Sequence, residues 1–435
     1  MNKCYLAIDL GASSGRHIVG YKSNGKIVLK EIYRFKTSMD ESPDGLVWDF
    51  NRIFGDIKLG IKKAFKAYPN IVSLSIDTWG VDYVLMNGDK EMPPYYAYRN
   101  KRNVSASECV EKIVPFEELY KLTGIQYANF NTIYQLYADK RAGRLNQATD
   151  YLMVPSYFTY KLTGVKTHEY TDESTGSLLN PYTGKYLNSL IEKLDLPKKL
   201  FKSISLPGEV VGELLPEIQK EVKGNCKVIL CASHDTASAF ESVDIDENSV
   251  LISSGTWSLL GIKSPTPIVS SKSYQANYTN EGGVGYIRFL KNIMGMWIAN
   301  RVKIETGLSQ EFIDKNINKV DYKVTFDVND ESLLAPDNMK KAVLKLLEKC
   351  PPQNDLEIFA SIYRSMAKCY KKAIEELEMI TEKQIDKVVI IGGGAKNVFL
   401  NKQVEEYTNK KVIAMPIEAT ALGNIKIQMK VSKEL

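Results

Sequence analysis

The sequence has few of the residues and segments that define several protein classes. Its 435 residues include six cysteines and three histidines, and no two cysteines form a CxxC pair. Structural zinc sites and disulfide frameworks need such clustered ligands, so we expect neither. No apolar run approaches the roughly 18 residues of a membrane-spanning helix, and the N-terminus has no charged-then-apolar signal pattern. We expect a cytoplasmic protein without a membrane partner.

An excess of charge of one sign is also absent. Lys and Arg number 57 against 52 Asp and Glu, a net charge of +5 without a long basic block. Nucleic-acid binding is therefore not expected. The 44% hydrophobic and 25% charged residues are ordinary for a globular protein. Small-molecule chemistry is the favoured function class.

The standard nucleotide-binding motifs are missing as well. No GxxxxGK[ST] sequence occurs, and the glycine turn at 392–394 has Asn397 where a dinucleotide-binding turn needs a third glycine. A nucleotide site in this chain would need a different fold.

The pattern of apolar runs predicts an α/β fold that occurs twice. Strands are expected at 4–9, 17–21 and 26–35, with a helix at 50–68 and a strand at 71–76. A similar strand, glycine turn and strand begins again at residue 250. Since 435 residues exceed the size of one core, we predict two domains, at residues 1–243 and 244–435.

Small residues in the turn Gly11–Arg16 let backbone N–H groups and hydroxyls approach phosphate oxygens. Asp9, at the end of the strand before this turn, is a candidate ligand of Mg²⁺, which prefers oxygen donors. A second turn at 254–258 offers the same geometry from the second half of the chain. Ordinary hairpin turns with a capping Asp are the alternative interpretation.

Asp235 is the candidate general base. It lies between a predicted strand and small residues that favour a helix start, where a carboxylate stays ionised. Phosphoryl transfer from ATP needs such a carboxylate near the attacking hydroxyl. A plain helix cap is the alternative.

The segment 76–82 has the composition of a sugar site. Asp77 and Asp82 would accept hydrogen bonds from hydroxyls, Trp79 offers an aromatic face, and Gly80 allows close approach. Asn292 is a further polar candidate. An acidic strand end without a ligand is the alternative.

Taken in order, these motifs resemble those of the FGGY carbohydrate kinases over nearly the whole chain. The strings DTWGVD at 77–82 and SHDTASA at 233–239 are the most specific. The resemblance implies two ribonuclease-H-like domains of the actin and hexokinase type, with a ligand cleft between them. It also implies that ATP, with Mg²⁺, phosphorylates L-rhamnulose at O1.

The resemblance further assigns roles to single residues. Asp235 would accept the proton, and the sugar would contact Gly80, His234 and Asn292. The nucleotide would contact Ala12, Ser13, Ser14, Gly15, Arg16, Thr256 and Gly394. Asn300 stands where relatives can carry a glutamine at the nucleotide, and relatives usually continue for some tens of residues beyond the last helix, so we expect a shortened C-terminal region.

Three alternatives remain open from the sequence. An ATPase switch of the actin or chaperone type would share the phosphate turns, and a sugar-sensing relative would share the fold. A kinase of a related ketose, such as L-fuculose or L-xylulose, would share the reaction. The sequence does not distinguish a monomer from a homodimer.

Overall fold

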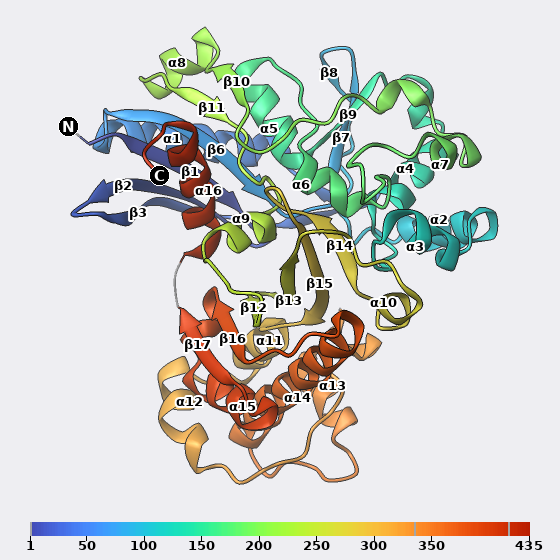
Figure 1. Ribbon diagram of the computed structural model, residues 1–435, viewed down its shortest axis with the longest axis vertical. Coiled ribbons are helices and arrows are strands. Elements are labelled where there is room, and N and C mark those ends of the chain that lie inside the picture. Colours follow the sequence, from blue (N-terminus) through green and yellow to red (C-terminus); the bar gives the residue numbers. More distant parts are fainter. Residues whose placement is uncertain (1, 335, 416–417) are drawn as a thin grey trace. The chain divides into compact units, whose positions relative to one another are not determined.

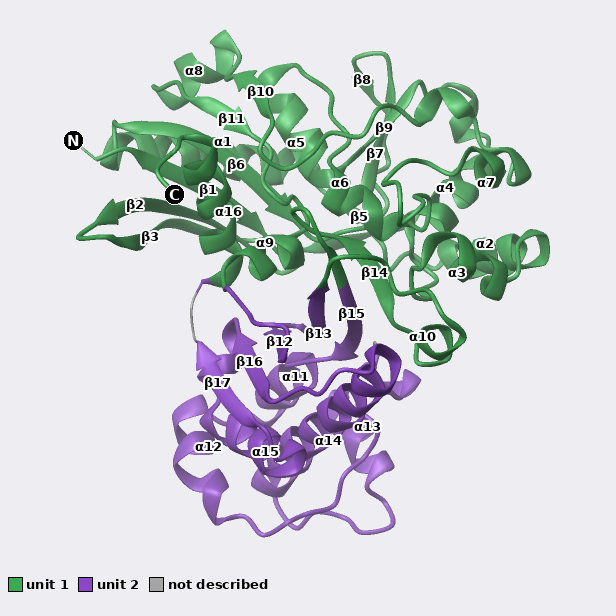
Figure 2. Ribbon diagram, viewed as in Figure 1, with its two compact units in different colours: residues 1–243, 264–288, 419–435 green, residues 244–263, 289–418 purple. Residues whose placement is uncertain are grey.

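The computed structural model describes residues 2–334, 336–415 and 418–435. The chain forms two compact units (Figure 2). Unit 1 comprises Met1–Val243, Ser264–Arg288 and Ala419–Leu435, and unit 2 comprises Asp244–Lys263 and Phe289–Glu418. The division predicted after residue 243 would place everything that follows in one domain, whereas two later segments cluster with unit 1.

Unit 1 is built on a six-stranded sheet with the order β10-β11-β6-β1-β2-β3 (Figure 1). β1 pairs antiparallel with β2 and parallel with β6, and β2 pairs antiparallel with β3. The three opening strands predicted from the sequence are therefore confirmed, and they form an antiparallel meander. The strand bounds are β1 (Cys4–Leu10), β2 (Ser14–Ser23), β3 (Lys26–Lys36), β6 (Ile71–Thr78), β10 (Val210–Glu213) and β11 (Lys227–Ile229).

Both faces of β1 are covered by helices. Alternate residues of a strand point to opposite faces, and Leu6 and Ile8 belong to the core that includes α1 (Phe50–Ala67). Tyr5 belongs to the core formed with α16 (Ala419–Val431). A strand buried on both faces is expected to read as a continuous apolar run. Asp9 interrupts that run, which indicates a role other than packing.

The sheet of the second half has the order β14-β15-β13-β12-β16-β17. β12 pairs antiparallel with β13 and parallel with β16, which repeats the pairing of β1 with β2 and β6. The strand bounds are β12 (Ser249–Ser254), β13 (Trp257–Ser264), β14 (Thr279–Gly282), β15 (Ile287–Met294), β16 (Lys387–Ile391) and β17 (Lys411–Met415). This common arrangement agrees with the predicted repeat of one α/β pattern.

The other elements surround these sheets. Those of unit 1 are β4 (Met39–Ser42), β5 (Gly45–Trp48), β7 (Tyr83–Asn87), β8 (Lys90–Glu91), β9 (Asp150–Met153), α2 (Arg102–Ile113), α3 (Phe116–Thr123), α4 (Thr132–Arg141), α5 (Val154–Thr163), α6 (Tyr170–Glu173), α7 (Asn188–Lys193), α8 (Pro216–Val222), α9 (Asp235–Glu241) and α10 (Ser271–Gln275). Those of unit 2 are α11 (Trp297–Thr306), α12 (Gln310–Asn316), α13 (Met339–Leu346), α14 (Asp355–Thr381) and α15 (Val398–Thr408). Within the described ranges, no helix has the length and apolar character required to cross a membrane.

Candidate active site

Two buried carboxylates lie side by side at the ends of β1 and β6 in unit 1. Asp9 and Asp77 are register partners on these parallel strands, and they are 4% and 0% exposed. Asp9 forms an ion pair with Arg16 on β2. Asp77 Oδ2 accepts a 2.6 Å hydrogen bond from Asn424 Nδ2. Burial, together with the charge of Asp9, raises the pKa of Asp77.

The predicted phosphate turn of unit 1, Gly11–Arg16, connects β1 to β2. The Gly11 N–H donates to the Ser14 carbonyl over 2.9 Å, and the Gly11 carbonyl accepts from Thr37 Oγ1 at 2.6 Å. A Cβ atom at Gly15 would lie 2.3 Å from the Phe35 ring, so only glycine fits there. The turn has a fixed backbone conformation, with Ala12 and Ser13 at its tip.

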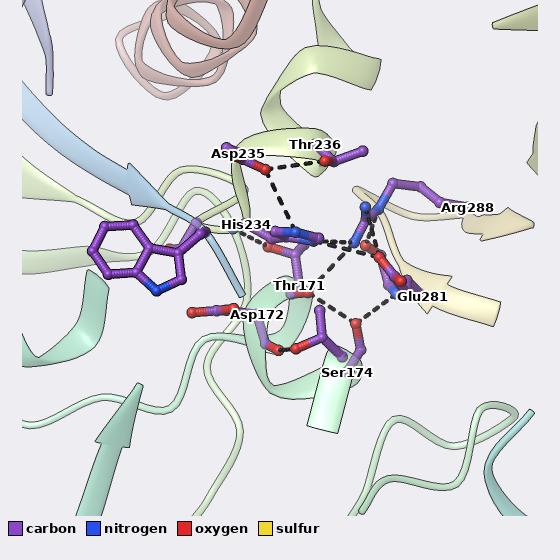
Figure 3. Close-up of polar contacts among 12 residues, drawn as sticks. Thr171, Asp172, Ser174, His234, Asp235, Thr236, Glu281 and Arg288 are labelled. Atoms are coloured by element: carbon purple, nitrogen blue, oxygen red, sulfur yellow. Dashed lines mark hydrogen bonds and ion pairs between the residues drawn. The ribbon is translucent and has the colours of Figure 1, made fainter. Parts of the chain in front are cut away.

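Asp235 is the accessible acid of the site. It begins α9, and its side chain is 33% exposed, whereas that of Asp9 is 6% exposed. Its Oδ1 accepts a 3.0 Å hydrogen bond from Thr236 Oγ1 and lies 3.5 Å from His234 Nε2 (Figure 3). An exposed carboxylate held by neighbouring donors can accept a proton from a ligand.

The opposite side of the His234 ring faces a buried ion pair. Arg288 is 0% exposed, and its Nη1 lies 3.1 Å from Glu281 Oε2. Arg288 Nη2 lies 3.1 Å from His234 Nδ1 (Figure 3). A guanidinium has only donors, so Nδ1 is the acceptor. In the tautomer that accepts this hydrogen bond, neutral His234 carries its hydrogen on Nε2, the nitrogen that faces Asp235; Glu281 Oε2 also lies near Nδ1, at 3.4 Å.

Glu281 stays charged opposite this guanidinium. Burial alone would raise the pKa of Glu281, but the pKa is lowered, and the charge of Arg288 is the largest cause of the lowering. Glu281 and Arg288 were not predicted from the sequence. Arg288 is a charged residue between the apolar Ile287 and Phe289 in β15, and this pattern could have identified it.

Asp82, at the end of the segment 77–82, accepts hydrogen bonds from two tryptophan side chains. Asp82 Oδ2 accepts from Trp48 Nε1 at 2.7 Å and from Trp79 Nε1 at 3.0 Å. The same oxygen accepts from the Tyr98 N–H, and Oδ1 accepts from Gln135 Nε2. Burial nevertheless raises the pKa of Asp82 to about 6. Asp82 thus orients both indoles, and its direct contact with a sugar stays a prediction.

The backbone beside Trp79 is strained. Val81 has a φ of 69°, which a β-branched residue rarely adopts. Its carbonyl accepts hydrogen bonds from Thr132 Oγ1 at 2.9 Å and from Gln135 Nε2 at 3.1 Å. Such strain persists only where the surroundings hold it, and it is typical of ligand sites. Next to it, a Cβ at Gly80 would lie 3.2 Å from Asp172 Oδ1.

Unit 2 contains the second set of predicted nucleotide residues. Thr256 lies in the turn between β12 and β13, and its carbonyl accepts from the Gly295 N–H at 3.2 Å. A Cβ at Gly394 would lie 2.0 Å from Ser254 Oγ at the end of β12. The structure thus brings the two glycine turns of this unit together.

The two amide side chains predicted for the site lie on different elements. Asn292 lies on β15, and Asn300 is an exposed residue of α11. The nucleotide contact expected for Asn300, and the sugar contact expected for Asn292, remain predictions.

Comparisons with known proteins agree along the whole chain. The N-terminal domain model of the FGGY family of carbohydrate kinases matches residues 4–240, and the C-terminal domain model matches residues 250–431. The rhamnulokinase of Oceanobacillus iheyensis is 42% identical, over 99% of this chain and 93% of the relative. The rhamnulokinase of Bacillus subtilis is 38% identical, over 99% and 91%.

Solved structures show the same fold at low identity. A xylulose kinase from Lactobacillus acidophilus superposes with a TM-score of 0.84 at 16% identity, covering 99% of this chain and 90% of that one. A Plasmodium falciparum glycerol kinase with ADP gives a TM-score of 0.78 at 13% identity, covering 100% and 90%. The two-domain α/β fold predicted from the sequence is confirmed. The chain belongs to the FGGY family of carbohydrate kinases, which use ATP to phosphorylate sugars.

Proposed function

We propose that this kinase phosphorylates L-rhamnulose at O1 to give L-rhamnulose 1-phosphate and ADP. Relatives named rhamnulokinase, 38–42% identical over nearly the full chain, support the substrate. The observation that carries the mechanism is the accessible carboxylate of Asp235, next to a His234 ring whose tautomer Arg288 fixes.

In this mechanism, Asp235 accepts the proton of the O1 hydroxyl as that oxygen attacks the γ-phosphorus of ATP. The O1–P bond forms, and the bond from the γ-phosphorus to the bridging oxygen breaks with its electron pair left on ADP. Phosphoryl transfer needs mainly positioning and charge stabilisation. Thr236 Oγ1, which donates to Asp235 Oδ1, and His234 Nε2–H hold the carboxylate in place.

The proposed nucleotide contacts are the residues of the predicted glycine turns and Asn300. The backbone N–H groups of the turn Gly11–Arg16, in unit 1, are suited to phosphate oxygens. In unit 2, Thr256, Gly394 and Asn300 are the proposed contacts.

Asp9 would hold Mg²⁺, directly or through water. The donor set fits the ion: Asp77 Oδ1 is buried and has no hydrogen-bond partner among the described residues, and it belongs to the register partner of Asp9. Mg²⁺ favours one or two carboxylates together with water and phosphate oxygens. When bound, it would neutralise charge on the phosphates.

The test is a coupled assay of ADP release from MgATP with L-rhamnulose, L-fuculose, L-xylulose, D-xylulose, glycerol or no sugar. We expect preference for L-rhamnulose. Preference for another ketose would replace the substrate but keep the reaction. Turnover that does not depend on sugar would favour an ATPase switch, and absent turnover would favour a sugar sensor.

The Asp235→Asn variant tests the base. Loss of a general base should lower kcat by roughly 10²- to 10⁴-fold, with ATP binding retained. Asp195→Asn, which changes a side chain that is 91% exposed, is the matched control and should behave like the wild type. Near-normal turnover of Asp235→Asn would remove this residue from the mechanism.

A further inference from the structure

Asp172, in α6, has a buried carboxylate without a hydrogen-bond partner in the part of the chain that the structure describes. It is 0% exposed, and neither of its carboxylate oxygens has a partner among the described residues. The carboxylates of the neighbouring Glu169 and Glu173, in contrast, accept hydrogen bonds from the protein. Glu169 accepts from the N–H groups of Thr171 and Asp172, and Glu173 accepts a 2.6 Å hydrogen bond from Tyr151 Oη.

Such an unpaired group is unusual and unfavourable. Native proteins pair nearly all of their buried polar atoms, and burying a polar group without a hydrogen bond destabilises the folded state. Burial, followed by the nearby carboxylates, raises the pKa of Asp172. A carboxyl group that takes up a proton both donates and accepts hydrogen bonds. A ligand group that also donates and accepts hydrogen bonds would pair with this carboxyl group.

The position of Asp172 suggests which ligand supplies that hydrogen-bonding group. A Cβ at Gly80 would lie 3.2 Å from Asp172 Oδ1 and 3.1 Å from Thr175 Oγ1. Asp235 and Asp82 are close enough to act on Asp172 electrostatically. In Figure 3 the Asp172 side chain points away from the cluster formed by Arg288 and Glu281. The free carboxyl thus lies beside the residues expected at the sugar.

We propose that Asp172 is a specificity-determining residue that hydrogen-bonds one hydroxyl group of the bound sugar. This inference rests on the proposed function, since it places the sugar between Gly80 and Asp235. A hydroxyl donates one hydrogen bond and accepts others, which suits an acid whose oxygens are both unused. A site built to pair a hydroxyl discriminates strongly against the analogue that lacks it, because the protein group is then left unpaired.

The test compares Asp172→Ala and Asp172→Asn with Glu173→Gln, a matched control in the same helix. Glu173 is also buried, but its carboxylate already has protein partners, Tyr151 and His168. The constants kcat and KM are measured for MgATP, for the preferred ketose and for its monodeoxy analogues, one per hydroxyl. Asp172→Asn keeps the shape of the side chain, so a result is obtained even where the Ala variant does not fold.

We expect Asp172→Ala to lower kcat/KM for the parent ketose by about 10- to 100-fold, mainly through the KM of the sugar, with the KM of ATP changed less than about twofold. Asp172→Asn, whose amide still donates and accepts hydrogen bonds, should lower it by a smaller factor. For one deoxy analogue the loss should disappear, because the hydroxyl that Asp172 binds is already absent. Glu173→Gln should lower kcat/KM equally for all sugars, or not at all. Equal losses for every analogue in the Asp172 variants, or no loss, would overturn the inference.

The wild-type assay separates this inference from the proposed function. If the wild type prefers a ketose other than L-rhamnulose, the proposed substrate fails, and the deoxy series of the preferred ketose still tests Asp172. If no sugar stimulates ADP release, both proposals fail.

Discussion

The contact between Arg288 and His234 predicts a tautomer that can be measured. Removing Arg288 alone would leave Glu281 as an unpaired buried charge, which typically costs about 3–5 kcal/mol. The perturbation is therefore Arg288→Met in a Glu281→Gln background, compared with Glu281→Gln alone. A hydrogen bond to a charged group contributes roughly 1.5–3 kcal/mol. At about 1.4 kcal/mol per tenfold change, its loss shifts the ratio of Nε2–H to Nδ1–H His234 by about 10- to 160-fold.

The assay is ¹⁵N NMR of protein labelled only at histidine, because protonated and unprotonated ring nitrogens give distinct signals. The chain has three histidines. The other two have internal partners: His17 Nε2 is 3.0 Å from the Ile57 carbonyl, and His168 lies between two carboxylates. Their signals therefore serve as references.

Activity provides the second readout. We expect kcat/KM of the double variant to fall below that of Glu281→Gln, by at most the factor by which the tautomer ratio changes. An unchanged His234 ring spectrum in the double variant would refute the reasoning. A changed spectrum with unchanged kcat/KM would show that the tautomer is fixed but has no role in turnover.

Two further predictions concern stability. Burial lowers the pKa of His168, but hydrogen bonds to two carboxylates outweigh it and raise the pKa to about 9. Unfolded histidine titrates near 6.5, so up to about 3 kcal/mol of stability, present below that pH, should be lost as the pH rises through about 9. Thermal unfolding from pH 6 to 9 should show this loss, and Glu173→Gln should reduce it; an equal slope in the variant would contradict it. A Cβ at Gly423 would lie 1.7 Å from the Ser238 carbonyl oxygen, so Gly423→Ala should cost roughly 3 kcal/mol or more. In α1, Gly55 has open space around it, so Gly55→Ala should instead stabilise by about 1 kcal/mol, and similar melting temperatures of the two variants would contradict this account.

The opening strands could be predicted from the sequence, because they depend on local pattern. The Asn24-Gly25 turn predicts a hairpin, and both residues have positive φ, 50° and 75°. Asp9 could be singled out because it interrupts a run of apolar residues. Such signals require only the residues of one strand and its turn.

The state of each acid could not be predicted in this way. Asp82 was predicted to contact the sugar and Asp172 was not predicted, yet Asp82 has four protein donors and the Asp172 carboxylate has none among the described residues. One donor to Asp82 is Trp79, three residues before it. The other donors belong to residues farther away in the sequence: Trp48, Tyr98 and Gln135. Hydrogen-bond satisfaction depends on tertiary contacts, so no spacing of residues reveals which carboxylate keeps its oxygens for a ligand.

The last helix, α16, supplies hydrogen-bond partners to buried polar groups of the sheet in unit 1. In α16, Asn424 donates to Asp77 Oδ2, and Gln428 donates to the Leu6 carbonyl while accepting from Ser73. Buried polar groups of a sheet need such partners. Residues 419–435 cluster with unit 1, and hydrogen bonds as well as apolar contacts hold them there. Without Asn424, the buried Asp77 carboxylate beside Asp9 would lose its hydrogen bond. The hydrogen bond from Asn424 thus opposes the burial and the Asp9 charge that raise the pKa of Asp77, at the strand ends where this kinase is proposed to bind Mg²⁺.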